Sequence, residues 1–260
     1  MKYFTRIFFI GCSLNIFFLQ LKFSSAQSFA SLNHKPDFVY SLNYKPNLAY
    51  WKSYGTDAVG YIKSPLKWKG DDFALATFVI GSAALMYAND DLIMSGIQQR
   101  KTETSKKISS VIEPLGRGYV ILGGMGAVYA GGLISGNKKV QHAALQGIKA
   151  GAITSAFTGL TKLISQRARP YQNFGPYHWT PLQGNESRSF FSGHTSYAFC
   201  AATMIAGYSH KTWVDVAAYT IATAIAFSRV HDYEHWASDV VIGAACGITI
   251  SHFIMKKSHW

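Results

Sequence analysis

From residue 72 onward the chain consists mainly of long apolar runs rich in Ala, Leu, Ile, Gly and Met, separated by short polar segments. Runs of this kind predict helices, and no convincing hairpin pattern interrupts them. The pattern therefore predicts an all-α fold, a helical bundle of about six core helices. Helices are expected over residues 72–89, 92–113, 118–135, 139–167, 194–209, 212–229 and 235–255.

Some of these apolar runs approach the length needed to cross a membrane. A transmembrane helix requires about 20 predominantly apolar residues. The stretches free of charged residues and histidine measure 20 residues over 118–137 and 17 over 73–89, whereas the others measure 12 to 15. We expect a membrane-embedded bundle, and a soluble periplasmic bundle is the alternative.

The first residues have the pattern of a secretory signal peptide. Lys2 and Arg6 precede an apolar stretch, and Ser24 and Ala26 supply the small residues at the −3 and −1 positions of a cleavage site. We expect a signal peptide over residues 1–26 and export to the cell envelope.

A near-duplication follows, SLNHKPDFVY and then SLNYKPNLAY, with a proline in each copy and little helical periodicity. This pattern predicts an extended N-terminal arm over residues 27–71. The helical domain is then expected over residues 72–260. Asp90 and Asp91, which come directly after a predicted helix, are expected to be solvated.

The charge of the chain limits its partners. The net charge is +12, from 25 Lys and Arg against 13 Asp and Glu, while only 15% of residues are charged and 48% are hydrophobic. A positive balance suits nucleic acid, acidic lipids or phosphate esters. Nucleic-acid binding would require a basic stripe with interleaved aromatic residues, and none stands out, so we expect no nucleic-acid partner.

Two segments combine residues that suit a phosphate group. In KLISQRARP, Lys162 and Arg169 lie about two helical turns apart and share a face at the end of a helix that Pro170 helps to terminate. In FFSGHTSYAF, Ser192 and Gly193 precede an apolar helix whose free N–H groups could bind a phosphate. A solvated basic helix end and an ordinary helix N-cap are the simpler alternatives.

The segment SRVHDYEHWASD can be divided in two ways. His231, Glu234 and His235 fit the H-x-x-E-H pattern of a zinc hydrolase. Alternatively, Arg229 ends one helix, and His235 and Asp239 begin the next as an i, i+4 pair in which Asp239 accepts a hydrogen bond from the imidazole. Zinc would need a third protein ligand, and the position of Asp239 one turn from His235 favours the second division.

The first of these three segments lies at a helix end and the second at a helix start. The third segment contains the end of one helix and the start of the next. In an up-down bundle all four positions lie at the same pole. Convergence of polar groups at one place favours a functional site over independent structural roles. We therefore expect an active site at one pole of the bundle.

The order K-x6-RP, SGH and SR-x5-H-x3-D resembles the signature of the type 2 phosphatidic acid phosphatase superfamily, which also contains bacterial acid phosphatases and vanadium haloperoxidases. One departure is Phe191, where the family usually has proline. The resemblance implies that His235 forms a phosphohistidine, that Asp239 orients it, and that His194 is the general acid and base. It further implies phosphate binding by Lys162, Arg169, Arg229 and the N–H groups of Ser192 and Gly193.

The resemblance thus implies a phosphatase that acts on a phosphate monoester or diphosphate, expected to be that of a membrane lipid, with no metal ion or other cofactor. The alternatives are a soluble acid phosphatase of small esters, a vanadium-dependent haloperoxidase and a non-enzymatic membrane protein. Nothing in the sequence indicates an oligomeric state.

Overall fold

The computed structural model describes residues 45–184, 186–209 and 211–258. The expected signal peptide over residues 1–26 lies outside them. The described residues form helices and no strand, apart from an isolated bridge between Arg167 and Trp179. The all-α prediction is confirmed. The helices are α2 (Leu48–Ile62), α3 (Gly70–Ala88), α4 (Asp90–Gln98), α5 (Glu103–Ile112), α6 (Gly118–Ile134), α7 (Lys138–Ser165), α8 (Gly193–Ser209), α9 (Thr212–His231) and α10 (Ala237–Lys257), with 3-10 turns η2 (Ser64–Lys67), η3 (Glu113–Gly116) and η4 (Pro170–Gln172).

The helix expected over residues 92–113 is wrong as a single helix, because α4 and α5 divide it. Thr102 begins α5 through a reciprocal pair of hydrogen bonds with Ser105, in which each backbone N–H donates to the other residue's side-chain oxygen. This capping pair starts a new helix within a polar stretch, residues 98–107, that separates the apolar residues of α4 from those of α5.

The extended arm expected over residues 27–71 is wrong over Leu48–Ile62, which form α2. Asn47 caps this helix by accepting the N–H of Tyr50. Tyr50 is fully buried, and its hydroxyl donates to the carbonyl of Leu145 in α7 at 2.7 Å. Packing against α7 thus stabilises a helix where the sequence predicts an extended arm.

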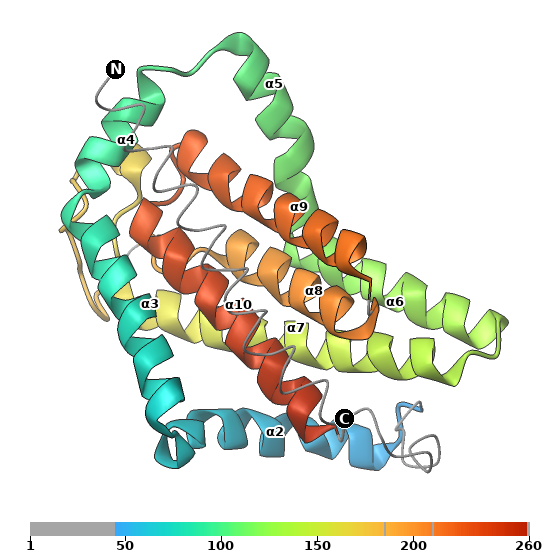
Figure 1. Cartoon of the computed structure of the whole chain (residues 1–260). Coiled ribbons are helices and arrows are strands. Elements are labelled where there is room, and N and C mark those ends of the chain that lie inside the picture. The colour runs from blue at the N-terminus through green and yellow to red at the C-terminus, as the bar shows by residue number, and fades with distance from the viewer. Residues whose placement is uncertain (1–44, 185, 210, 259–260) are drawn as a thin grey trace.

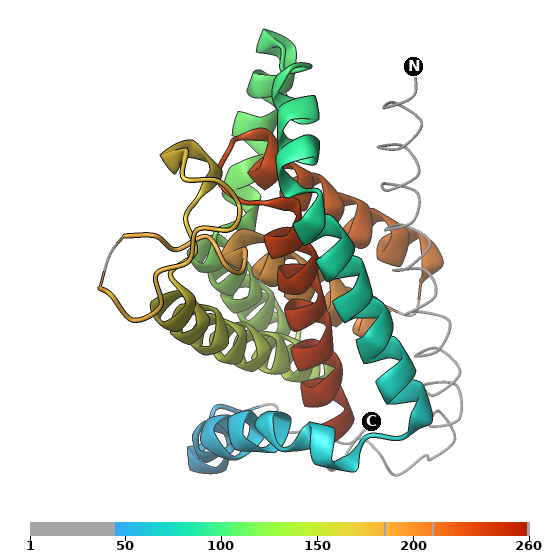
Figure 2. The same cartoon turned by 90° about the vertical axis from the view of Figure 1, so that its left-hand side faces the viewer.

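Helix α8 lies at the centre of the bundle, between α7, α9 and α10 (Figure 1). Its two sides contribute to separate hydrophobic clusters, one around Phe199 with α9 and α10, the other around Met204 with α7 and α10. Helix α2 lies across the end of the bundle near the end of α10, and the irregular segment between α7 and α8 projects at one side (Figure 2).

Two glycines bring α8 and α10 into backbone contact. A Cβ atom at Gly243 would lie 2.7 Å from the Ser192 carbonyl oxygen, and one at Gly247 would overlap the Ser196 carbonyl. At the start of both helices the Ser192 N–H donates to the Asp239 carbonyl at 3.1 Å. The glycines therefore hold the N-terminal ends of α8 and α10 together at one pole.

Within the described part of the chain, two helices are long and apolar enough to cross a membrane, α3 and α10. Helix α3 exposes large apolar side chains, among them Phe78 and Ile80, whereas α10 is mostly buried. Core helices of soluble proteins meet the same criterion of length and composition. Helix α6, in which the longest apolar stretch was expected, has 17 residues.

Candidate active site

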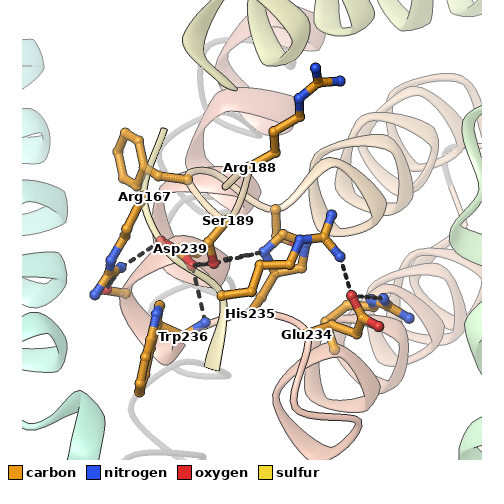
Figure 3. A network of polar contacts seen from close by, with 12 residues as sticks. Arg167, Arg188, Ser189, Glu234, His235, Trp236 and Asp239 are labelled. Atoms are coloured by element: carbon orange, nitrogen blue, oxygen red, sulfur yellow. Dashed lines mark hydrogen bonds and ion pairs between the residues drawn. The ribbon is translucent and has the colours of Figure 1, made fainter. Parts of the chain in front are cut away.

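The three predicted clusters meet at the pole where α7 and α9 end and α8 and α10 begin. The Lys162 ammonium donates to the Arg188 carbonyl at 2.5 Å. The adjacent Ser189 hydroxyl donates to Asp239 Oδ2 at 2.5 Å, and the His235 N–H donates to the Arg229 carbonyl at 3.2 Å. Short contacts thus connect segments that are far apart in the sequence (Figure 3).

His235 lies in the loop before α10, and its side chain is 3% exposed. Its Nδ1 is 3.8 Å from Asp239 Oδ2 and 3.5 Å from the Ser189 hydroxyl. His235 and Asp239 thus face each other as expected, at a distance longer than that of an ordinary hydrogen bond, and the Ser189 hydroxyl lies within reach of both. Burial, assisted by the charge of Lys162, lowers the pKa of His235 to about 3, so its imidazole is neutral at neutral pH.

Asp239 is fully buried and accepts three hydrogen bonds. Besides that of Ser189, it accepts the Trp236 N–H at 3.0 Å, which caps α10, and Arg167 Nη1 at 2.6 Å. Figure 3 shows these groups on one side of His235. Asp239 is thus fixed by its surroundings before any substrate is present.

Arg167 connects this carboxylate to a distant part of the chain. Its guanidinium is fully buried and also pairs with Asp90, at the start of α4, at 2.8 Å. Asp90 is 1% exposed and accepts from the N–H and hydroxyl of Ser238, so the expectation that it is solvated is wrong. Sequence reasoning missed Arg167, although it lies between Lys162 and Arg169.

His194 lies in the first turn of α8, opposite a carboxylate that the sequence did not indicate. Its Nε2 is 2.8 Å from Glu113 Oε1 in η3. Glu113 also pairs with Arg229 at 3.2 Å and with Arg117 at 3.1 Å. Burial, and then the charge of Arg229, lower the pKa of His194 to about 4.

Lys162 and Arg169 lie close enough to His235 for their charges to add to the effect of burial and lower its pKa. Arg229 lies close enough to Lys162 to add in the same way to the effect of burial on the pKa of that residue. Two of these three predicted phosphate-binding cations already have carboxylate partners. Arg169 pairs with Glu234, and Arg229 lies between Glu234 at 3.6 Å and Glu113. Burial, with repulsion from Arg169, lowers the pKa of Lys162 to about 7. The site therefore carries concentrated positive charge, which the carboxylates of Glu234 and Glu113 partly compensate.

Ser192 does not present its N–H to a phosphate as expected, because this group donates to the Asp239 carbonyl. Its hydroxyl accepts from Thr195 at 2.9 Å instead, inside the first turn of α8. The N–H of Gly193, the first residue of α8, has no carbonyl four residues earlier within the helix, so the positive end of α8 faces this pole. Phe191, which stands where the family usually has proline, is 6% exposed, and the peptide bond that precedes it is cis.

The residues of the H-x-x-E-H pattern do not converge. His231 ends α9, where its Nδ1 is 2.9 Å from Asp232 and its Nε2 is 2.8 Å from the Ser105 hydroxyl. Glu234 turns to Arg169, and His235 lies in the following loop. Because both ring nitrogens of His231 are engaged elsewhere, the geometry favours the second division of this segment.

Comparison with known proteins agrees with the resemblance found in the sequence. Residues 145–260 match the sequence model of the PAP2 superfamily, and this region contains all three clusters. Over 82 residues the chain is 42% identical to a lipid A 1-phosphatase from Porphyromonas gingivalis. This aligned region covers 30% of this chain and 18% of that protein. Over 130 residues it is 32% identical to a PA-phosphatase related-family protein from Dictyostelium discoideum, covering 44% of this chain and 47% of that one.

The chain thus spans less than half the length of these curated relatives. A structural match supports the fold. The crystal structure of a transmembrane PAP2 type phosphatidylglycerolphosphate phosphatase from Bacillus subtilis superposes with a TM-score of 0.54 at 21% identity, covering 71% of this chain and 94% of that one.

Proposed function

We propose that this chain, a type 2 phosphatidic acid phosphatase-like protein, hydrolyses a phosphate monoester or diphosphate of a membrane lipid. The observation that carries the proposal is that Lys162, Arg169 and Arg229 lie close to one another at the pole where His235 is buried and neutral. Phosphoryl transfer requires mainly positioning and charge compensation, and these residues can supply both.

In the first step His235 attacks phosphorus through Nε2, since its Nδ1 faces Ser189 and Asp239. The bond from phosphorus to the leaving alkoxide breaks as the bond to Nε2 forms, giving a phosphohistidine. The Nδ1–H donates to the Ser189 hydroxyl, which in turn donates to Asp239 and so transmits the stabilising effect of the carboxylate to the imidazolium.

His194 supplies a proton to the leaving alkoxide and then removes one from the water that hydrolyses the phosphohistidine. Its lowered pKa suits the second role, because the neutral imidazole accepts a proton. The negative charge of a bound phosphate raises that pKa and favours the protonated form that the first role requires.

Lys162, Arg169 and Arg229 bind the equatorial oxygens, together with the Gly193 N–H at the positive end of α8. Three cations compensate the charge of a dianionic ester, a task that metal ions share in many other phosphoryl-transfer enzymes. We therefore expect activity without added metal.

A lipid substrate is favoured by the apolar outer surface of α3 and by the names of the relatives, which act on lipid A and on phosphatidylglycerol phosphate. On this view α3, whose apolar side chains are exposed, attaches the protein to the membrane of the cell envelope, with the site at its surface. A soluble phosphatase of small esters is the alternative.

Release of phosphate from phosphatidic acid in detergent micelles, compared with release from a short-chain soluble ester, separates these substrate classes. His235→Ala should abolish release from both, whereas His178→Ala, which changes an exposed histidine outside the clusters, should retain it. Undiminished turnover by His235→Ala would contradict the proposed nucleophile.

A further inference from the structure

Glu234 places a carboxylate among the cations that are proposed to bind phosphate. Its Oε2 pairs with Arg169 Nη1 and lies 3.6 Å from Arg229 Nη2. Figure 3 shows Glu234 joined to guanidinium groups on the side of His235 opposite Arg167 and Asp239. Its side chain is 30% exposed, so the carboxylate lies at the rim of the site and can move aside.

The backbone holds Glu234 close to the site. The N–H groups of Glu234 and His235 both donate to the Arg229 carbonyl, at 3.1 and 3.2 Å. Tyr233, directly before them, has a φ of 66° and turns the chain back toward α9. The carboxylate is therefore presented by the same tight turn that presents His235, and only rotation of its side chain can remove it.

A phosphate group and the Glu234 carboxylate require the same donors. Phosphate held by Arg169 and Arg229 would use the guanidinium N–H groups that now face Glu234, and the two anions would repel each other at such a separation. In the free protein, by contrast, the carboxylate relieves the repulsion between the two arginines.

We infer that Glu234 occupies the phosphate-binding position of the free protein and competes there with the phosphate group. The inference rests on the proposed function, because it takes the two arginines as ligands of the phosphate. Glu234 moves aside when substrate binds and pairs with the arginines again when inorganic phosphate leaves. It thereby weakens product binding and favours release.

Asp232 offers a matched control two residues away. Its carboxylate binds His231 at 2.9 Å and the Ser109 hydroxyl at 2.7 Å. Asp232→Asn removes the same charge from the same turn without removing the ion pair with Arg169. It separates competition at the arginines from a general change in electrostatic potential.

The test is a calorimetric titration of the purified protein, Glu234→Gln and Asp232→Asn with inorganic phosphate. If the carboxylate pairs with the arginines for about 90% of the time, its removal tightens phosphate binding about tenfold. We expect this tightening in Glu234→Gln and nearly unchanged affinity in Asp232→Asn. Inhibition of hydrolysis by phosphate should strengthen in the same proportion.

The inference would be overturned if Glu234→Gln bound phosphate as weakly as the unchanged protein or more weakly, or if neither of these two proteins bound phosphate. Glu234 would then be a residue that orients the arginines. Equal tightening in Asp232→Asn would also overturn it, because the effect would then be one of general charge. Because titration does not require turnover, tighter binding by Glu234→Gln in a protein that hydrolyses nothing would contradict only the proposed function.

Discussion

Replacing Arg167 by methionine should destabilise the protein and abolish its activity. The side chain is fully buried and forms ion pairs with Asp90 at 2.8 Å and with Asp239 at 2.6 Å. Methionine fills much of the same volume but leaves both carboxylates buried without a cation. Asp239 then no longer supports the proposed phosphohistidine step, although it lies 72 residues away in sequence.

The expected loss of stability follows from the type of contact. Breaking a buried ion pair by removing one partner costs about 3–5 kcal/mol, because the remaining charge stays desolvated. In a chain of this size about 1 kcal/mol corresponds to a change in Tm of roughly 2–4 °C. The midpoint should therefore fall by between about 6 and 20 °C.

A second substitution distinguishes a coupled network from a general packing defect. In the Arg167→Met variant both Asp90 and Asp239 are buried carboxylates without a cation, and Asp90→Asn removes one of these charges. The added substitution should therefore raise the free energy of unfolding of Arg167→Met by about 1–3 kcal/mol, within the range measured for coupled neighbours. Activity should not return, because Asp239 still lacks its cation.

Thermal denaturation followed by circular dichroism measures the stability, and phosphate release is assayed on the same samples below the midpoint. Arg100→Met, which changes an exposed arginine in the turn after α4, serves as the control and should lie within about 0.5 kcal/mol of the unchanged protein. An Arg167→Met variant that is as stable as this control would refute the reasoning. The reasoning would also be refuted if Asp90→Asn lowered the free energy of unfolding equally in the Arg167→Met background and in the unchanged protein.

Three further outcomes test the proposed chemistry. Ser189→Ala removes the hydroxyl beside Asp239 and His235. Loss of a hydrogen bond to a charged group costs about 1.5–3 kcal/mol, so kcat should fall roughly 10- to 150-fold, whereas Ser187→Ala should leave kcat unchanged. Lys162 loses its proton as the pH rises through its pKa of about 7, so kcat/KM should decline above that pH, and Lys162→Arg should remove the decline because a guanidinium stays charged. Orthovanadate should inhibit hydrolysis while EDTA leaves it unchanged; strong loss of activity in EDTA would instead indicate a metal site.

The main helices could be predicted from the sequence, because each depends on a long apolar run. Helix α2 could not, since it depends on contacts such as that of Tyr50 with Leu145, 95 residues away. The break between α4 and α5 could have been predicted from the short polar segment that ends at Thr102, but the apolar pattern on both sides concealed it.

The site divides in the same way. His194, His235 and Asp239 belong to short motifs whose spacing is visible in the sequence. The Arg167–Asp90 pair spans 77 residues and depends on how α4 packs beside α10. Glu113 and Glu234 could be identified as partners of the arginines only once distances were known, because a charge in a sequence does not reveal which opposite charge it meets.

The glycines of α10 also limit how this protein can be regulated. Gly243 and Gly247 carry no side chain, so the backbone of α10 rests directly on the carbonyls of Ser192 and Ser196, and at these two positions no rotamer change can alter the spacing of the helices. These contacts lie at the start of both helices, next to the proposed acid and the proposed nucleophile, so we expect the separation of these two residues to vary little. We expect a ligand or a change in the surrounding lipid to act more readily through the carboxylates that approach the arginines, Glu113 from η3 and the partly exposed Glu234 from the turn before α10.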